Sequence, residues 1–138
     1  MTSAPIVTLV EYEDASPEVR AVFDDIMATR KTDRVNNFWK ALANHPPTLR
    51  QVWEEVKTVM SAGALDPLTK ELIYIAISAT NGCEYCTYSH TASGRIKGMT
   101  DEMLAETLAV AALANKTNRL ANGYRVPVDS IFFDPPKD

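Results

Sequence analysis

Apolar residues recur along most of the chain at steps of three and four residues, which is the spacing that forms one face of an α-helix. Ser16 and Pro17 are typical of a helix cap and of a first helical residue, and the apolar pattern after them predicts an amphipathic helix over about 17–30. A second, shorter segment around Trp39 stops before Pro46, because a proline disfavours the helical conformation of the residue ahead of it. Both tryptophans of the chain lie on apolar stripes, so we expect them in the core.

Two more apolar patterns predict the third and fourth helices. The third follows a stripe that ends near Met60, and Gly63 is expected as its C-terminal cap. Asp66 and Pro67 repeat the signal of a cap and a first helical residue, and they predict a fourth helix over about 68–80. Apolar residues surround most of the circumference of this fourth helix, so we expect it to be buried at the centre of the fold.

The second half of the chain can be helical throughout, because residues 68–126 contain no proline. Asn81 and Gly82 interrupt the apolar pattern, and a fifth helix is expected over about 83–97. Thr100 is a typical cap, and it predicts a sixth helix over about 101–116. The residues expected to face inward from this helix are Met103, Leu104, Leu108, Ala111 and Ala112. One more turn can follow the sixth helix, and beyond Gly123 the chain is expected to be extended.

No strand pattern competes with these helices, and the chain contains no internal repeat, linker or low-complexity stretch. The sequence therefore predicts an all-α fold, a compact bundle of about six helices. We expect a single domain over residues 1–138, with its core at 16–123 and extended tails at both ends.

Composition narrows the classes of function. The 138 residues carry a formal net charge of −4 with no local excess of Lys and Arg, which argues against binding of nucleic acid. No apolar run approaches the roughly 20 residues that a membrane-spanning helix needs, and the first residues do not form a secretory signal. We therefore expect a cytoplasmic protein that does not associate with membranes. Two cysteines are too few for a disulfide scaffold, so their spacing needs another explanation.

The spacing Cys83-x-x-Cys86-x-x-x-His90 brings two thiols and an imidazole onto one stripe of the fifth helix, because residues three and four apart on a helix are neighbours. Cys83 is expected in the first turn, where unpaired backbone N–H groups and the helix dipole favour a thiolate. Glu71 is expected in the first turn of the fourth helix. If the face that carries Glu71 meets the cysteine helix, burial raises the pKa of the carboxyl group and makes it a candidate base.

Other interpretations of these residues stay open. The two cysteines can be small buried hydrophobes, and Glu71 can be a solvated acid that the helix dipole favours. Zinc, bound by the cysteines, His90 and Glu71, is a further alternative. Structural zinc sites usually draw paired ligands from two similar tight turns, which argues against a metal here. Tyr85, between the two cysteines, is a candidate auxiliary hydrogen-bond donor.

At these residues the chain resembles a known family. Residues 65–73 (LDPLTKELI) and 78–90 (SATNGCEYCTYSH) are similar to the core of the alkylhydroperoxidase AhpD-like family, within the carboxymuconolactone decarboxylase superfamily. The resemblance is specific over residues 66–98. It implies an all-helical fold that assembles into homotrimers or homohexamers, and a thiol peroxidase activity that needs no metal, haem or flavin cofactor.

The family pattern assigns a role to each polar residue. It makes Cys86 the thiol that attacks the peroxide, Cys83 the resolving thiol, and Glu71 with His90 the proton relay. The spacing agrees on the attacking thiol, because Cys86 lies about 6 Å from His90 along the helix axis and Cys83 lies about 10.5 Å away. A sulfenic acid at Cys86 can then condense with Cys83 to a disulfide, which an external dithiol reduces.

We therefore expect a cofactor-free hydroperoxide reductase that also needs an unidentified dithiol reductant. A disulfide reductase or redox sensor that uses the same dithiol is the first alternative. A lyase like the decarboxylases of the superfamily is the second, although the cysteine pair weighs against it, and a non-enzymatic helical assembly module is the third. The apolar tail residues Ile131, Phe132 and Phe133 lack an amphipathic helix to bury them, which favours a partner chain as cover and a homotrimer or homohexamer.

Overall fold

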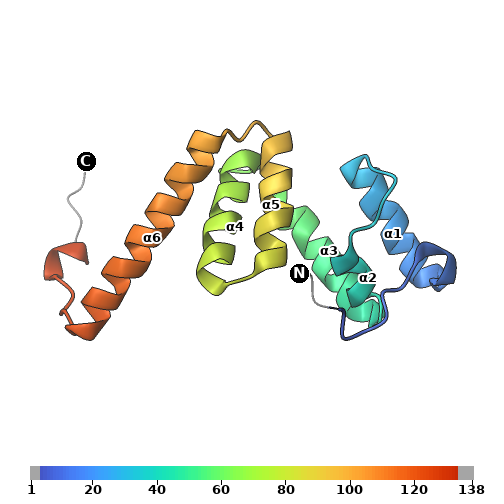
Figure 1. Cartoon of the computed structure of the whole chain (residues 1–138), viewed down its shortest axis with the longest axis horizontal. Coiled ribbons are helices and arrows are strands. Elements are labelled where there is room, and N and C mark those ends of the chain that lie inside the picture. The colour runs from blue at the N-terminus through green and yellow to red at the C-terminus, as the bar shows by residue number, and fades with distance from the viewer. Residues whose placement is uncertain (1–3, 134–138) are drawn as a thin grey trace. The chain divides into compact units, whose positions relative to one another are not determined.

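The computed structural model describes residues 4–133, and this part of the chain folds into six α-helices and two short 3-10 helices without a β-strand (Figure 1). The predicted all-α fold of about six helices is confirmed. Nowhere in this part of the chain is a helix both long and apolar enough to cross a bilayer. In chain order the elements are η1 (Tyr12–Asp14), α1 (Pro17–Arg30), α2 (Asn37–Leu42), α3 (Pro46–Met60), α4 (Pro67–Asn81), α5 (Glu84–Ile96), α6 (Asp101–Gly123) and η2 (Ser130–Phe132).

Three of the helices begin at the capping residues that the sequence predicts. The side-chain oxygens of Ser16, Asp66 and Thr100 each accept a hydrogen bond from the backbone N–H three residues later, at 3.3, 2.9 and 3.1 Å. These bonds satisfy backbone donors that have no partner inside the helix. A proline follows the cap directly in α1 and α4, where its fixed φ angle suits the first helical position.

Two helices end at residues other than those predicted. After α3 the backbone of Ser61 is extended (φ −69°, ψ 161°), so the helix ends without a left-handed glycine and Gly63 is not its cap. The predicted end of α6 near residue 116 is also wrong, because this helix continues to Gly123. Residues 117–122 contain neither proline nor glycine, so nothing local stops the helix earlier.

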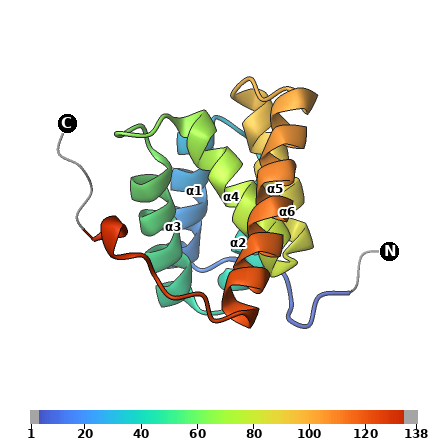
Figure 2. The same ribbon diagram turned by 90° about the vertical axis from the view of Figure 1, so that its left-hand side faces the viewer.

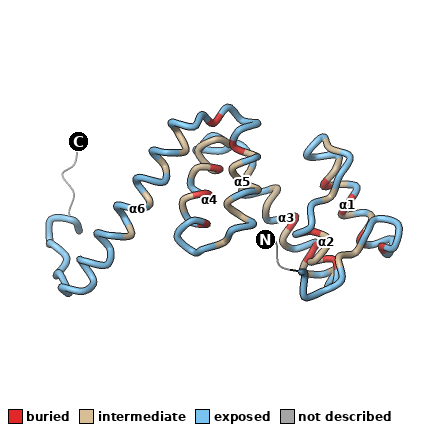
Figure 3. The backbone as a smooth tube through the Cα atoms, viewed as in Figure 1, coloured by how far each residue is buried: buried red, intermediate tan, exposed pale blue. Residues whose placement is uncertain are grey.

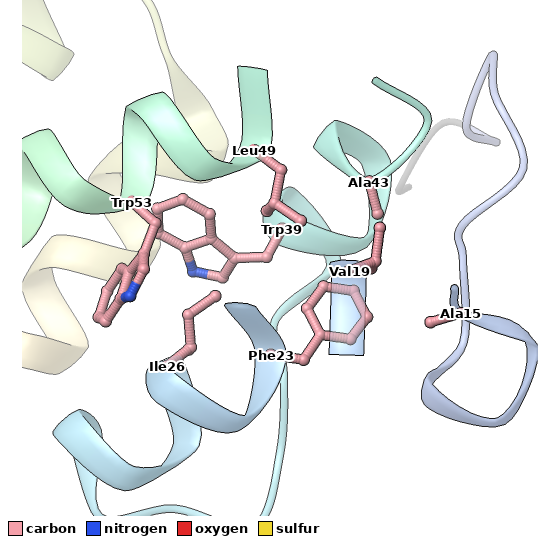
Figure 4. Close-up of a cluster of buried hydrophobic side chains, with 8 residues drawn as sticks. All are labelled: Ala15, Val19, Phe23, Ile26, Trp39, Ala43, Leu49 and Trp53. Carbon is pink, nitrogen blue, oxygen red and sulfur yellow. The ribbon is translucent and has the colours of Figure 1, made fainter. Parts of the chain in front are cut away.

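The described chain divides between α3 and α4 into two compact units, and the expectation of a single domain stays a prediction. The first unit contains η1, α1, α2 and α3, and α1 lies beside α3 (Figure 2). Phe23, Ile26 and Leu49 are almost fully enclosed in its core (Figure 4). The indole rings of Trp39 and Trp53 meet edge to face with their centroids 5.4 Å apart, so both tryptophans lie in the core, as predicted.

The second unit contains α4, α5, α6 and η2, and α4 packs against both α5 and α6 (Figure 1). The buried side chains of α4 are Glu71, Ile75 and Ser78, which lie on one face of the helix. Ile73 and Ile77 are 44% and 56% exposed. The prediction that α4 is buried on nearly all sides is therefore wrong for this chain, because the neighbouring helices cover only part of its circumference.

α6 has no buried residue, and each of its residues is either partly buried or exposed (Figure 3). Among the residues that the sequence predicts to face inward, Leu108 and Ala112 are exposed, whereas Met103, Leu104 and Ala111 are partly buried. The tail keeps exposed apolar side chains as well, although η2 adds a short helical turn to a segment that is otherwise irregular. The large exposed apolar side chains of α6 and the tail include Val110, Leu113, Leu120, Val126, Val128, Ile131, Phe132 and Phe133.

Candidate active site

The two cysteines lie at the start of α5, directly after the turn that ends α4. Gly82 ends α4 in the left-handed conformation (φ 72°), which glycine adopts without strain. Cys83 is the N-cap of α5 rather than a residue of its first turn, and its Sγ accepts a hydrogen bond from the backbone N–H of Cys86 at 3.3 Å. A disulfide joins Cys83 to Cys86, so the structure describes the oxidised form of this pair.

Glu71 lies in the contact between α4 and α5. It belongs to the second turn of α4, which begins at Pro67, and not to the first turn as the sequence suggests. The residue is only 3% exposed. Its Oε2 lies 2.7 Å from Nδ1 of His90, and its Oε1 accepts hydrogen bonds from Ser93 Oγ at 2.7 Å and from Lys97 Nζ at 2.9 Å. The face of α4 that carries Glu71 therefore does meet the cysteine helix.

The surroundings of Glu71 lower the pKa of its carboxyl group from 4.5 to about 2. Burial is the largest single influence and raises this pKa, but the hydrogen bonds from His90, Lys97 and Ser93 and the positive charge of Lys97 together outweigh it. The expectation that burial raises this pKa is therefore wrong, whereas the catalytic role of Glu71 stays a prediction. Near neutral pH, Glu71 is an anion that anchors its neighbours.

The ionised Glu71 decides which ring nitrogen of His90 carries a hydrogen. A carboxylate only accepts hydrogen bonds, so Nδ1, which lies 2.7 Å from it, is the nitrogen that donates. The neutral imidazole therefore has Nε2 as its basic nitrogen. The ring of Tyr74 stacks on the imidazole with a centroid separation of 3.6 Å and an interplanar angle of 20°. The carboxylate and the aromatic ring together hold the orientation of His90.

Sequence reasoning misses three residues of this site, namely Tyr74, Ser93 and Lys97. Ser93 and Lys97 continue the stripe of α5 that carries Cys86 and His90, because positions 86, 90, 93 and 97 follow one another at steps of four, three and four. Extending the stripe toward the end of the helix would have found both residues. Nothing in the sequence marks Tyr74 as a neighbour of the imidazole.

Two further expectations for the site concern Tyr85 and metal ligands. Tyr85 lies between the cysteines and is 44% exposed, and its role as an auxiliary hydrogen-bond donor stays a prediction. Within residues 4–133, no three His, Cys, Asp or Glu side chains are grouped as metal ligands. The site combines the disulfide of Cys83 and Cys86 with an imidazole that a buried anion orients.

Comparison with known sequences identifies the class of protein. The sequence profile of the carboxymuconolactone decarboxylase family matches residues 46–129, which is more than half of the chain. The chain therefore belongs to the carboxymuconolactone decarboxylase family. Within the solved structures, the chain is similar to the alkylhydroperoxidase AhpD core from Rhodospirillum rubrum, with a TM-score of 0.90 and 51% sequence identity over 95% of this chain and 98% of that chain. The resemblance to AhpD-like proteins that the motif indicates is confirmed.

Two curated relatives are also similar to this chain. One, from Paracoccus denitrificans, carries the name "Uncharacterized protein 4 in cox locus" and is 39% identical over 56 residues, or 41% of this chain. The match spans half the length of that relative. The other, an uncharacterized protein from Cupriavidus necator, is 33% identical over 85 residues, which is 61% of this chain and 74% of the relative. At the level of the family, the fold supports a function of the alkylhydroperoxidase type.

Proposed function

We propose that this protein is a thiol peroxidase, which reduces hydroperoxides by cycling Cys83 and Cys86 between a dithiol and a disulfide. The observation that carries the proposal is the 2.7 Å hydrogen bond between Glu71 and Nδ1 of His90. This bond leaves Nε2 of His90 as a base on the stripe of α5 that also carries Cys86. The likeness to the AhpD core from Rhodospirillum rubrum supports the same function.

The first half of the cycle consumes the peroxide. In the reduced protein, Nε2 of His90 takes the proton of the Cys86 thiol. The thiolate attacks the outer oxygen of the hydroperoxide, the O–O bond breaks, and Cys86 becomes a sulfenic acid. The alkoxide that leaves takes the proton from His90 and departs as an alcohol. Glu71 stays ionised and stabilises the imidazolium that exists between these two proton transfers.

The second half of the cycle restores the dithiol. The sulfur of Cys83 attacks the sulfenic sulfur of Cys86, an S–S bond forms, and water leaves. The disulfide in the structure corresponds to the product of this step. An external dithiol then reduces the disulfide by exchange and supplies the two electrons that the peroxide accepted. These steps balance with thiols alone, so the proposed cycle calls for no metal, haem or flavin.

A second candidate function, dithiol exchange with protein partners, is favoured by the position of Cys83. Cys83 is the N-cap of α5, and its Sγ accepts a hydrogen bond from the backbone N–H of Cys86. The N-terminus of a helix stabilises a thiolate at such a position. A thiolate there can attack the disulfide of another protein. The two functions therefore differ in their first nucleophile, which is Cys86 for a peroxide and Cys83 for exchange.

Stopped-flow mixing of the reduced protein with organic hydroperoxides and hydrogen peroxide tests the assignment. We expect Cys86→Ser to abolish peroxide reduction and Cys83→Ser to leave one sulfenic acid at Cys86, which dimedone labels. Ser89→Ala is a matched control, because it removes a hydroxyl from the same helix and keeps both thiols. Labelling of Cys83 in the Cys86→Ser variant would reverse the roles. Disulfide exchange without peroxide consumption would favour the second function.

We also propose that the protein assembles into a homotrimer or homohexamer. The exposed apolar side chains of α6 and the tail, such as Val110 (67% exposed) and Phe133 (72% exposed), form surface that a second copy can cover. Light scattering at micromolar concentration measures the mass of the particle. A mass near the 15.3 kDa of one chain would contradict this assembly.

A further inference from the structure

We propose that Lys97, together with Ser93, is a positioning residue of this site, which keeps Glu71 ionised and so leaves His90 able to act as the base. The proposal rests on the function proposed above and deepens it. It accounts for a feature that burial alone does not explain, since a carboxylate that is 3% exposed stays charged beside an imidazole.

Lys97 and Ser93 reach Glu71 from the same stripe of α5 as His90. Lys97 is the C-cap of α5, and hydrogen bonds from its backbone N–H to the carbonyls of Ser93 and Gly94 hold it one turn beyond Ser93. Its Nζ donates to Glu71 Oε1 at 2.9 Å and to Ser93 Oγ at 2.7 Å. Ser93 Oγ donates to the same Oε1 at 2.7 Å. Lys97 Nζ, Ser93 Oγ and Glu71 Oε1 are thus hydrogen-bonded to one another in all three pairs. The other carboxylate oxygen, Oε2, is bonded to His90.

The charge of Lys97 changes which protonation state the buried pair adopts. Burial penalises a carboxylate that has no cationic partner, so without Lys97 the Glu71–His90 pair would keep a proton on one of its members up to a higher pH. The Lys97 ammonium supplies the opposite charge permanently, and the imidazole can therefore be neutral while Glu71 stays an anion. The side chain of Lys97 is 34% exposed, so solvent screens part of this effect.

The charged and titratable groups near the pair come from both helices. Tyr74 of α4 stacks on the His90 ring, and Cys86 lies one turn before His90 on α5. Arg95, a second cation near the end of α5, donates to Asp101 at the start of α6 at 2.7 Å. Arg95 is thus engaged in a surface ion pair, and Lys97 is the cation bonded to Glu71.

The test compares Lys97→Met with Lys97→Arg, which keeps the charge, and with Arg95→Met as a matched control on the same helix. The chain has only two histidines, so ¹⁵N NMR of the oxidised protein resolves the His90 ring. The spectra report its tautomer and the pH at which the Glu71–His90 pair releases its proton. We expect Lys97→Met to raise this pH by about one unit, and Lys97→Arg and Arg95→Met to leave it near the wild-type value. The acid limb of the peroxide-reduction profile should move by the same amount.

An unchanged titration in Lys97→Met would overturn the proposal, because the ammonium would then be a mere surface contact. If Lys97→Met does not fold, Lys97→Gln replaces it with the same expectation, since Gln keeps a donor and lacks the charge. The NMR measurement does not depend on turnover. A shifted titration in a protein that does not reduce peroxides would therefore support the role of Lys97 and count against the proposed peroxidase function alone.

Discussion

The substitution Glu71→Gln removes one negative charge from the site and changes its shape very little. In the variant, the amide oxygen remains toward Lys97, because an ammonium group only donates hydrogen bonds. The amide nitrogen then faces Nδ1 of His90. Because that nitrogen also only donates, Nδ1 must become the acceptor and the ring hydrogen moves to Nε2. The variant thus holds His90 in the tautomer that cannot take a proton from Cys86.

The change of tautomer has a measurable kinetic consequence. We expect kcat/KM for an organic hydroperoxide at pH 7 to fall by about 10²- to 10⁴-fold, which is the contribution typical of general base catalysis. Alkylation of Cys86 should also require a higher pH than in the wild type. Stopped-flow kinetics and timed alkylation with mass spectrometry measure the two effects. If the variant kept kcat/KM to within about tenfold of the wild-type value, the proton relay through Glu71 and His90 would be refuted. A histidine held in the wrong tautomer lowers the rate by more than about tenfold.

The same substitution has a predictable effect on stability. A pKa that falls from 4.5 to about 2 on folding means that ionised Glu71 stabilises the folded protein by about 3 kcal/mol at pH 7, relative to its neutral form. Since the folded-state pKa is the lower one, this contribution is complete above about pH 5 and is lost as the pH falls toward 2. Gln resembles the neutral acid. The free energy of unfolding of the wild type should therefore exceed that of the variant by about 3 kcal/mol at pH 7 and by about 1.5 kcal/mol at pH 3.

Urea unfolding of the wild type and of Glu71→Gln at pH 7 and pH 3 measures this difference in the free energy of unfolding. Glu106→Gln, which changes an exposed acid of α6, is the matched control and should leave the free energy nearly unchanged at both pH values. A difference between wild type and Glu71→Gln that does not shrink at pH 3 would refute the reasoning, because the stabilisation would then not depend on the ionised carboxylate.

Two further predictions concern the aromatic residues. Tyr74→Leu should lower kcat/KM for peroxide by about fivefold, because it removes a stacking contact worth about 1 kcal/mol. Tyr74→Phe should keep most of the activity. Equal values of kcat/KM for Tyr74→Leu and the wild type would contradict this prediction. Trp53→Phe should lower the free energy of unfolding by about 1–3 kcal/mol in urea titrations, because it removes the 2.7 Å hydrogen bond from Nε1 to Asp25 and leaves unfilled space in the core. An unchanged unfolding midpoint would count against that bond.

The helix starts could be predicted from the sequence because the interactions that set them are local. A cap such as Ser16, Asp66 or Thr100 bonds to a backbone N–H only three residues away, and that distance along the chain is visible in the sequence. The stripe that carries Cys86 and His90 is local in the same sense, since residues four apart on a helix are always neighbours. The helix ends are less determined, because α6 has no local stop signal before Gly123.

Only the tertiary structure decided the charge of the site. Whether Glu71 is a base or an anchored anion depends on the donors that face it from α5, and the way that α4 and α5 pack selects Ser93 and Lys97 for this place. Burial alone predicts a raised pKa, and the opposite result follows because the three donors outweigh desolvation. The exposure of Ile77 on α4 was likewise decided by which helices pack around it. Such contacts join residues far apart in the chain, and the rotation of one helix against another has no periodic signature in the sequence.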